Sequence, residues 1–225
     1  MCFSQITFFH HNSNFHSNNP LHLEADYFFI FTLIKVIIVI DEQILISLGA
    51  ELKHYAPGNI IFSNNSFCKY YFQIKKGTVK LCNTGEDGKE LVHGFPFEGH
   101  CFGESYLFTD LAYAMDAVSL EHAEILILEK NSLLQYLVIN PTLILKINQY
   151  TAERLHFRYL ISSFLITSNP AVRLTKLFDH LKQYFGNIDQ FSFKIPYTKH
   201  QISCVTGLRT ETVIRTLKKC RWKKN

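Results

Sequence analysis

Apolar residues recur along the chain with two different spacings, and each spacing predicts a different kind of element. Near the start, Ile44, Leu45, Leu48 and Leu52 lie three or four residues apart. This is the period of a helix, which should end before Pro57-Gly58. We therefore expect one short helix ahead of the region that follows.

From about residue 59 to residue 128, short runs of β-branched and aromatic residues alternate with turns. Lys76-Gly77 and the segment 85–88 supply glycines, which adopt the positive φ that tight turns require. Short strands at regular intervals predict a small antiparallel barrel or roll. The predicted strands are 60–62, 70–74, 78–81, 91–95 and 125–128.

Helical spacing returns after residue 129. Helical character should return at residues 130–132, where Asn131 or Ser132 can cap a helix that runs to Asn140-Pro141. A longer helix is expected from about residue 142 to residue 166.

Seven positions of this long helix lie alternately three and four residues apart, which is the spacing of a coiled-coil seam. Asn148 and Ser162 are its polar interruptions. The repeat is short, so an ordinary helix packed on its own roll is the alternative to a dimer contact. The apolar seam residues are Leu145, Ala152, Leu155, Tyr159 and Ile166.

Another helix should follow Ser168-Asn169-Pro170, because Ser and Asn cap helices and Pro is favoured in the first turn. We place a domain boundary between Thr167 and Pro170, and we expect Gly186 to end this helix. Its apolar face consists of Ala171, Leu174, Leu177, Phe178, Leu181 and Phe185.

Residues 195–219 have the pattern of two short helices joined at Thr206-Gly207-Leu208. This outline is typical of a helix-turn-helix, whose second helix enters the major groove of DNA. The residues expected to face inward are Ile202, Val205, Leu208, Val213 and Leu217. The outer face is left with Thr210, Glu211, Ile214 and Arg215.

Positive charge is concentrated in the same region. From Pro196 to the end there are eight Lys or Arg and one acidic residue, a net charge of +7, whereas the whole chain carries +4. A basic tail is often merely solvated. Here it coincides with the helical pattern, which favours contact with phosphate.

The composition predicts a folded protein, since 47% of the 225 residues are hydrophobic. Six cysteines contain no C-x-x-C pair, so we expect buried thiols in a reducing cytoplasm, with no metal or cofactor. The apolar segment 27–40 is shorter than the roughly 20 residues of a membrane span, so no membrane partner is expected. Residues 1–26 follow neither period and should be poorly ordered.

The order of short helix, glycine-punctuated roll, long helix and helix-turn-helix resembles the Crp/Fnr family of bacterial transcription regulators, over roughly residues 41–220. Three segments carry the resemblance: Tyr-Phe-Gln-Ile-Lys-Lys-Gly-Thr-Val at 71–79, Gly-Glu-Ser-Tyr-Leu-Phe at 103–108 and Gly-Leu-Arg-Thr-Glu-Thr-Val-Ile-Arg at 207–215.

The resemblance implies an α+β fold with an antiparallel β-roll like that of cyclic-nucleotide-binding domains, a long dimerisation helix and a helix-turn-helix of winged-helix type. It implies a homodimer that is not an enzyme, binds double-stranded DNA at a palindromic site and contacts RNA polymerase. The expected parts are an N-terminal extension 1–40, an effector domain 41–140, a dimerisation helix 141–167 and a DNA-binding domain 168–225.

In that family a Glu and an Arg of the recognition helix contact base edges, and Glu211 and Arg215 of the helix 208–219 match them. Arg can donate two hydrogen bonds to guanine, and Glu can accept one from cytosine. Because they are four residues apart, an ion pair within the helix is the alternative. The predicted DNA-binding residues are Thr198, Thr210, Glu211, Ile214, Arg215, Lys218 and Lys219.

The effector pocket implied by the resemblance contains Gly103, Glu104 and Ser105. Members that bind cyclic AMP continue about ten residues later with Arg-Ser or Arg-Thr, where this chain has Ala114 and Met115. A buried phosphate without a guanidinium partner is costly. We therefore expect an effector other than cyclic AMP, or none.

The family continues past the recognition helix into a β-hairpin wing, whereas this sequence ends soon after Cys220. We expect the wing to be missing and the affinity for DNA to be reduced. The charges of residues 221–225 can still meet phosphate.

A rival interpretation is a cupin-like roll that binds a ligand or a metal, as a sensor or an enzyme, with a degraded DNA-binding part. His93, His100 and Glu104 are its candidate ligands, although the paired H-x-H of such sites is absent. Cys82 and Cys101 are candidate redox thiols, but nothing beside them in the sequence is expected to lower a thiol pKa.

Overall fold

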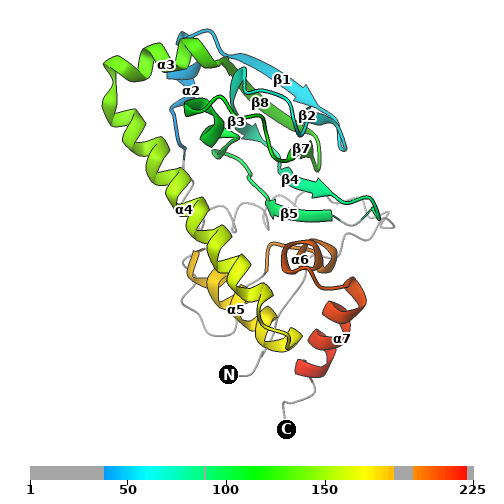
Figure 1. Ribbon diagram of the computed structural model, residues 1–225. Helices are drawn as coiled ribbons and strands as arrows, with labels where there is room; N and C mark the ends of the chain where they lie inside the picture. The colour runs from blue at the N-terminus through cyan, green and yellow to red at the C-terminus, as the bar shows by residue number, and fades with distance from the viewer. Residues whose placement is uncertain (1–37, 89, 185–194, 222–225) are drawn as a thin grey trace, which may run out of the picture. The chain divides into compact units, whose positions relative to one another are not determined.

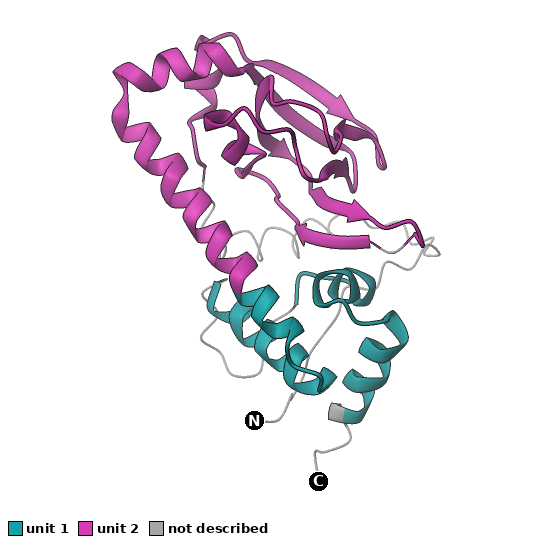
Figure 2. Cartoon of the chain, viewed as in Figure 1, with its two compact units in different colours: residues 1–36, 160–225 teal, residues 37–159 magenta. Residues whose placement is uncertain are grey.

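The computed structural model describes residues 38–88, 90–184 and 195–221. For residues 220 and 221 only the backbone is described. The chain divides into two compact units (Figure 2). Residues up to 159 form the first, called here the roll unit, and the described residues from 160 onward form the second, the C-terminal unit. The domain boundaries expected from the sequence stay a prediction.

The roll unit contains two four-stranded antiparallel sheets, with strand orders β1-β8-β3-β6 and β2-β7-β4-β5 (Figure 1). All five predicted strands are present, and the predicted α+β architecture is confirmed. The strands are β1 Glu51–Tyr55, β2 Ile60–Phe62, β3 Tyr70–Lys76, β4 Val79–Thr84, β5 Glu90–Gly94, β6 Cys101–Phe102, β7 Asp116–Ser119 and β8 Ala123–Glu129.

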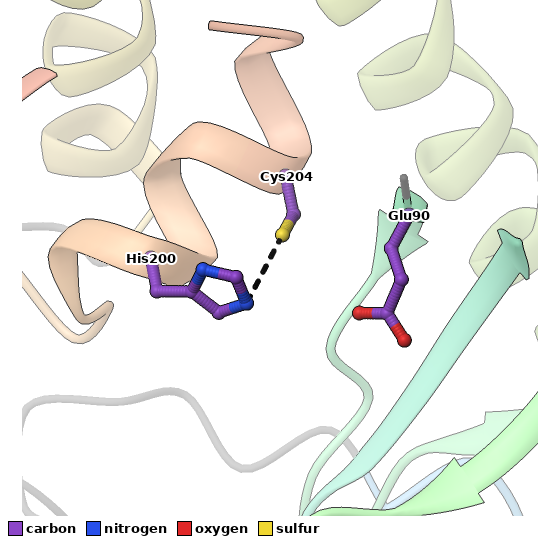
Figure 3. Close-up of side chains that lie close together, drawn as sticks. All are labelled: Glu90, His200 and Cys204. Carbon is purple, nitrogen blue, oxygen red and sulfur yellow. Dashed lines mark hydrogen bonds between the residues drawn. The ribbon is translucent and has the colours of Figure 1, made fainter. Parts of the chain in front are cut away.

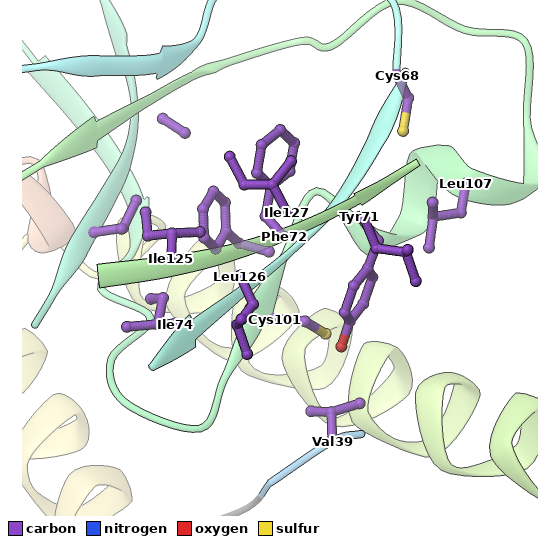
Figure 4. Close-up of a cluster of buried hydrophobic side chains, with 14 of the residues drawn as sticks. Val39, Cys68, Tyr71, Phe72, Ile74, Cys101, Leu107, Ile125, Leu126 and Ile127 are labelled. Carbon is purple, nitrogen blue, oxygen red and sulfur yellow. The ribbon is translucent and has the colours of Figure 1, made fainter. Parts of the chain in front are cut away.

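The centre of the first sheet is the pairing of β3 with β8, in which Tyr71 lies opposite Leu128 and Gln73 opposite Leu126. Residues 125–128 of β8 are all buried, so this strand has core on both faces and its sequence shows no alternation. The surrounding core is drawn in Figure 4.

The N-terminal helix is shorter than predicted. Helix α2 spans Glu42–Ser47, and Asp41 caps it by accepting a 2.8 Å hydrogen bond from the Gln43 N–H. Gly49, with φ 91°, turns the chain away, and Leu52 lies on β1 opposite Leu126. The prediction that Leu52 belongs to the helix was wrong, because pairing with β8 outweighs a helical spacing of apolar residues.

Three helical segments complete the helical part of this unit: the 3₁₀ helix η1 Glu104–Phe108, α3 Lys130–Ile139 and α4 Pro141–Leu165, whose last turns belong to the C-terminal unit.

The predicted cap of α3 was wrong. Its N-cap is Glu129, the last residue of β8, and Asn131 and Ser132 lie inside the helix. The strand passes directly into the helix, so no residue remains for a separate cap.

The C-terminal unit contains α5 Pro170–Tyr184, α6 Lys199–Thr206 and α7 Thr210–Arg221. As predicted, Asn169 caps α5, since its Oδ1 accepts a 2.9 Å hydrogen bond from the Ala171 N–H. Phe185 and Gly186 lie outside the described residues. The buried face of α5 consists of Leu174, Leu177, Phe178 and Leu181.

Among the described residues, none of the helices has the length and apolar character needed to cross a bilayer. Most of the apolar segment 27–40 lies outside them. Its end is tied to the roll: the Gln73 side chain accepts from the Ile40 N–H at 3.1 Å and donates to the Ile40 carbonyl at 2.7 Å.

Candidate nucleic-acid interface and effector site

Helix α6 begins with a complete capping box. The Gln201 N–H donates to Thr198 Oγ1 at 3.1 Å, and the Thr198 N–H donates to Gln201 Oε1 at 2.8 Å. Helix α6 ends at Gly207, whose φ of 64° is left-handed. A β-carbon there would also lie 3.4 Å from Leu165 Cδ2, so glycine fixes the turn between the two helices.

The two helices pack through the side chains that the sequence places inside. Ile202 and Val213 are fully buried, Val205 and Leu217 nearly so, and Leu208 is half-buried. Ser203 Oγ and Thr210 Oγ1 lie 3.0 Å apart and join α6 to the first turn of α7. The angle between α6 and α7 is therefore held by apolar packing and one polar contact.

Arg173 of α5 ties the helix-turn-helix to the rest of its unit. Its guanidinium donates to the carbonyls of Thr206 at 2.8 Å, Thr167 at 2.7 Å and Leu165 at 3.0 Å. These are carbonyls at or beyond helix ends, which otherwise lack partners. Sequence reasoning missed this role, since the contacts join distant segments.

The outer face of α7 exposes the residues predicted to contact bases. Glu211 and Arg215 are exposed, as are Lys218 and Lys219. No salt bridge joins Glu211 to Arg215 within the described part of the chain, so the alternative of an internal ion pair does not hold here. Both groups are available to an external partner.

The other predicted DNA-binding residues are less available. Ile214 is half-buried, the Thr210 hydroxyl faces Ser203, and the Thr198 hydroxyl accepts the capping hydrogen bond. This capping hydrogen bond does not use the hydroxyl proton of Thr198.

The long helix α4 leaves the predicted seam uncovered. Leu145 is 68% exposed, Leu155 44%, Tyr159 65% and Ile166 87%. Ala152 and the polar members Asn148 and Ser162 are exposed as well. The alternative, in which this stripe packs on the chain's own roll, does not hold for the side chains described.

In the predicted effector site, Glu104 is buried and follows Gly103, which has a φ of 70°. A β-carbon at Gly103 would come within 3.1 Å of Phe62 and Tyr113. Glycine is therefore required both for the backbone turn and for close packing, and it directs Glu104 inward.

Glu104 meets a guanidinium from outside the roll. Arg154 of α4 has its Nε 4.0 Å from Glu104 Oε1, and Thr151 donates to the same oxygen at 3.4 Å. Arg154 Nη1 also donates to the Cys101 carbonyl at 2.8 Å and to the Tyr150 hydroxyl at 3.0 Å. Sequence reasoning sought an arginine within the roll. The 3.6-residue period places Thr151 and Arg154 on one face of α4, which is a signal that could have located it.

The remaining effector residues are engaged or exposed. Ala114 is exposed and its backbone is held on both sides, since its N–H donates to the Tyr106 hydroxyl at 3.1 Å and its carbonyl accepts from Asn83 Nδ2 at 2.7 Å. Met115 is buried and Ser105 is exposed. The loop where the resemblance places a phosphate-binding arginine is thus tied down by the roll's own side chains.

The candidate metal ligands do not gather. Among the described residues, His93, His100 and Glu104 do not place their ligand atoms within 4.8 Å of one another. His93 Nε2 lies 2.6 Å from Asn83 Oδ1, and the His100 ring packs on Phe97 at 4.0 Å. Burial, with a smaller effect of Arg154, lowers the pKa of His100 to about 3. This arrangement gives the cupin-like interpretation no support.

The thiol of Cys101 is unsuited to redox sensing. Burial, followed by the nearby Glu104 carboxylate, raises its pKa well above the ordinary value. The thiolate is the reactive form of cysteine. Cys101 is therefore a core residue.

On α6, His200 and Cys204 lie one turn apart, with Cys204 Sγ 3.6 Å from His200 Nε2 (Figure 3). Glu90, drawn in the same figure, belongs to β5 of the roll unit. Within the C-terminal unit the pair offers two ligand atoms, fewer than a closed metal site requires.

Known proteins match the chain in its sequence and in its fold. Residues 52–140 match the family model "Cyclic nucleotide-binding domain". The Electron transport regulator A of Shewanella oneidensis is 25% identical over 167 residues, which are 73% of this chain and 66% of that protein. The chain thus spans about two thirds of the length of that relative.

Two solved structures have the same fold. The c-di-GMP-responsive global regulator CLP of Xanthomonas campestris matches with a TM-score of 0.66 and 18% identity, over 80% of this chain and 90% of its own. A transcriptional regulator of the CRP/FNR family from Thermus thermophilus matches with a TM-score of 0.58 and 18% identity, over 77% of this chain and 87% of its own. Residues 52–140 are thus similar to cyclic nucleotide-binding domains, and the chain has the same fold as these two regulators.

Proposed function

We propose that the chain is a homodimeric transcription regulator that binds double-stranded DNA through the outer face of α7. The single observation that carries the proposal is that Glu211 and Arg215 are exposed, and unpaired among the described residues, on a helix whose inner face is packed. The function is regulatory rather than enzymatic, as in the structural relatives named above.

The chemistry of α7 suits a base pair. Arg215 can donate two hydrogen bonds to guanine O6 and N7, and Glu211 can accept from cytosine N4. Among the described residues, neither side chain has an ion pair that must break before it contacts DNA. None of the free energy of the new hydrogen bonds is therefore lost in breaking such a pair. Lys218 and Lys219 lie one turn further along α7, where they meet phosphate and position the helix.

Dimerisation uses the exposed stripe of α4. An apolar seam at coiled-coil spacing is covered when the same helix of a second copy packs against it. Two recognition helices related by a twofold axis then bind half-sites about 34 Å apart, which is one turn of DNA. A palindromic target follows from this symmetry.

The roll is the effector domain of this regulator, and RNA polymerase is a further partner that the regulatory role implies. No arginine stands at the roll position from which cyclic AMP is held, so the effector is of another kind. Such an effector acts by binding the DNA-competent arrangement more tightly than the other.

A test of dimerisation and DNA binding together uses Leu155→Asp, which places a charge in the seam. The matched control is Val138→Asp, at an exposed apolar position of α3 outside the seam. Sedimentation should give a dimer for the wild type and for Val138→Asp, and a monomer for Leu155→Asp. Gel-shift titration should show that the monomer binds DNA more weakly.

The proposal fails if the wild type sediments as a monomer and does not shift DNA at low salt. If the two variants sediment equally, the seam is not the dimer contact. DNA binding is then judged by the gel-shift titration alone.

A further inference from the structure

Helix α6 carries a histidine and a cysteine one turn apart, and both belong to the C-terminal unit. His200 is the second residue of the helix and Cys204 lies four positions later, which places both side chains on the same helical face. Cys204 Sγ lies 3.6 Å from His200 Nε2 (Figure 3). The sulfur and the ring nitrogen therefore face each other before anything binds.

The local structure of α6 holds the two side chains in this arrangement. The first turn, which contains His200, is fixed by the capping box between Thr198 and Gln201. The His200 carbonyl accepts a 2.7 Å hydrogen bond from Ser203 Oγ. Binding groups that are carried by a fixed helix lose little freedom when a ligand arrives, so less of the binding free energy is spent on ordering them.

The separation of the two atoms suits a metal ion. A metal such as zinc lies about 2.3 Å from a thiolate sulfur and about 2.0 Å from an imidazole nitrogen. Two such bonds reach across about 4.3 Å, which is more than the 3.6 Å between Cys204 Sγ and His200 Nε2. One ion can therefore bond to both atoms without movement of α6. His200 is exposed, so an ion can enter from solvent on that side.

The number and the kind of ligands decide between metal ions. Magnesium and calcium bind through oxygen, which this pair does not offer. Zinc in a closed site takes four ligands, and the pair supplies two. Cu(I) is satisfied by two ligands, and it is a soft ion that prefers thiolate and accepts imidazole. The chemistry of the pair therefore matches Cu(I).

We propose that His200 and Cys204 form a binding site for Cu(I) on α6. The Cys204 thiol releases its proton to solvent, and the thiolate sulfur and the neutral His200 Nε2 each donate an electron pair to the ion. No electron is transferred, since copper enters and stays as Cu(I). The ion takes the place of the hydrogen bond between thiol and ring. This inference does not rest on the proposed function.

The experiment is a titration of the full chain with Cu(I), without oxygen, in ascorbate and against a coloured Cu(I) chelator. The test variants are Cys204→Ser and His200→Gln. Because the chain has six cysteines and eleven histidines, matched controls remove the same residue types elsewhere. They are Cys68→Ser in the roll unit and His156→Gln at an exposed position of α4.

We expect the wild type and both controls to take one Cu(I) from the chelator, and both test variants to lose this equivalent. X-ray absorption of the wild type with one equivalent bound should show sulfur and nitrogen as copper ligands. The ion binds the native state, so it should raise the thermal unfolding midpoint of the wild type and the controls but not of the test variants. A merely structural hydrogen bond would not produce this dependence on copper.

The proposal is overturned if the wild type takes no Cu(I) from the chelator, or if both test variants hold as much as the controls. Loss in only one of the two test variants would show that His200 and Cys204 do not act as one site, and it overturns the proposal as well. Should Cys204→Ser fail to fold, the exposed His200→Gln against His156→Gln decides alone. Because DNA is absent throughout, neither result bears on DNA binding.

Discussion

Two Glu–Arg pairs on this chain have opposite surroundings. Glu104 and Arg154 belong to the roll unit, where both side chains are largely buried and lie 4.0 Å apart with added hydrogen bonds. Glu211 and Arg215 lie one turn apart on α7, where both are exposed and form no salt bridge with any residue that the structure describes. The first Glu and Arg contact each other inside the fold, whereas the second Glu and Arg face solvent, where they can contact a binding partner.

The difference follows from solvation. A buried charge requires a partner, since losing water is costly, so Glu104 and Arg154 depend on each other. An exposed pair gains little from contact, and its two groups remain hydrated and ready to exchange water for DNA. Changes at the first pair should affect folding, and changes at the second should affect binding.

The largest effect is expected from Glu104→Gln, which keeps the shape and removes the charge. It leaves the Arg154 guanidinium without its carboxylate, and removing one member of a buried pair costs about 3 kcal/mol or more. Urea unfolding should show this loss, while the exposed Glu51→Gln changes stability by less than about 0.5 kcal/mol. A cost for Glu104→Gln no greater than that of the control would contradict the account.

Arg215→Ala should behave in the opposite way. Its free energy of unfolding should stay within about 0.5 kcal/mol of the wild type. Its binding to DNA should weaken by about 1–3 kcal/mol, with relaxed preference at one base pair of each half-site. Gel-shift titration against single-base variants of the target measures both, and an unchanged preference at every base pair would remove Arg215 from base recognition.

His100 lies in the same buried surroundings as Glu104 and Arg154, and its ring packs against Tyr150. Its contribution to stability should therefore depend on pH. Its pKa of about 3 in the folded chain lies below its ordinary value of 6.5. The unfolded chain therefore binds an extra proton between these values, and this contribution to stability is lost as the pH falls from about 6.5 towards 3.

His100→Phe keeps an aromatic ring and cannot take up a proton. It should reduce the loss of stability on acidification by on the order of 1 kcal/mol per pH unit, whereas the exposed His54→Gln should not. Urea unfolding between pH 7 and pH 4 gives the slopes, and identical slopes for the wild type and His100→Phe would show that His100 is protonated in the fold.

The smallest effect is expected from Lys218→Gln, which removes one phosphate contact. The slope of log affinity against log salt should fall by about one, uniformly across DNA sequences. Lys146→Gln on α4 is the control and should leave the slope unchanged. A slope for Lys218→Gln equal to that of the wild type would place Lys218 away from phosphate.

Local patterns predicted much of the fold. The apolar periods located the strands of the roll, the long helix and the inner face of the helix-turn-helix, because each period follows from one element's own geometry. Leu52 and Ser132 were misplaced for a different reason. Their positions depend on the pairing of β1 with β8 and on the direct passage from β8 into α3, neither of which is encoded locally.

The effector site shows the same limit. The Gly103-Glu104 motif was visible in the sequence, but its partner Arg154 lies 50 residues further on and reaches it through tertiary packing. Exposure of Glu211 and Arg215 was predictable because it follows from helical phase alone.

Binding-site selection from random duplex DNA with the full chain tests the central claim most directly. The account predicts enrichment of a palindrome whose half-sites are separated by one helical turn, about 10 base pairs, and a changed sequence with Arg215→Ala. Recovery of DNA without any enriched sequence, or no recovery even at low salt, would contradict it.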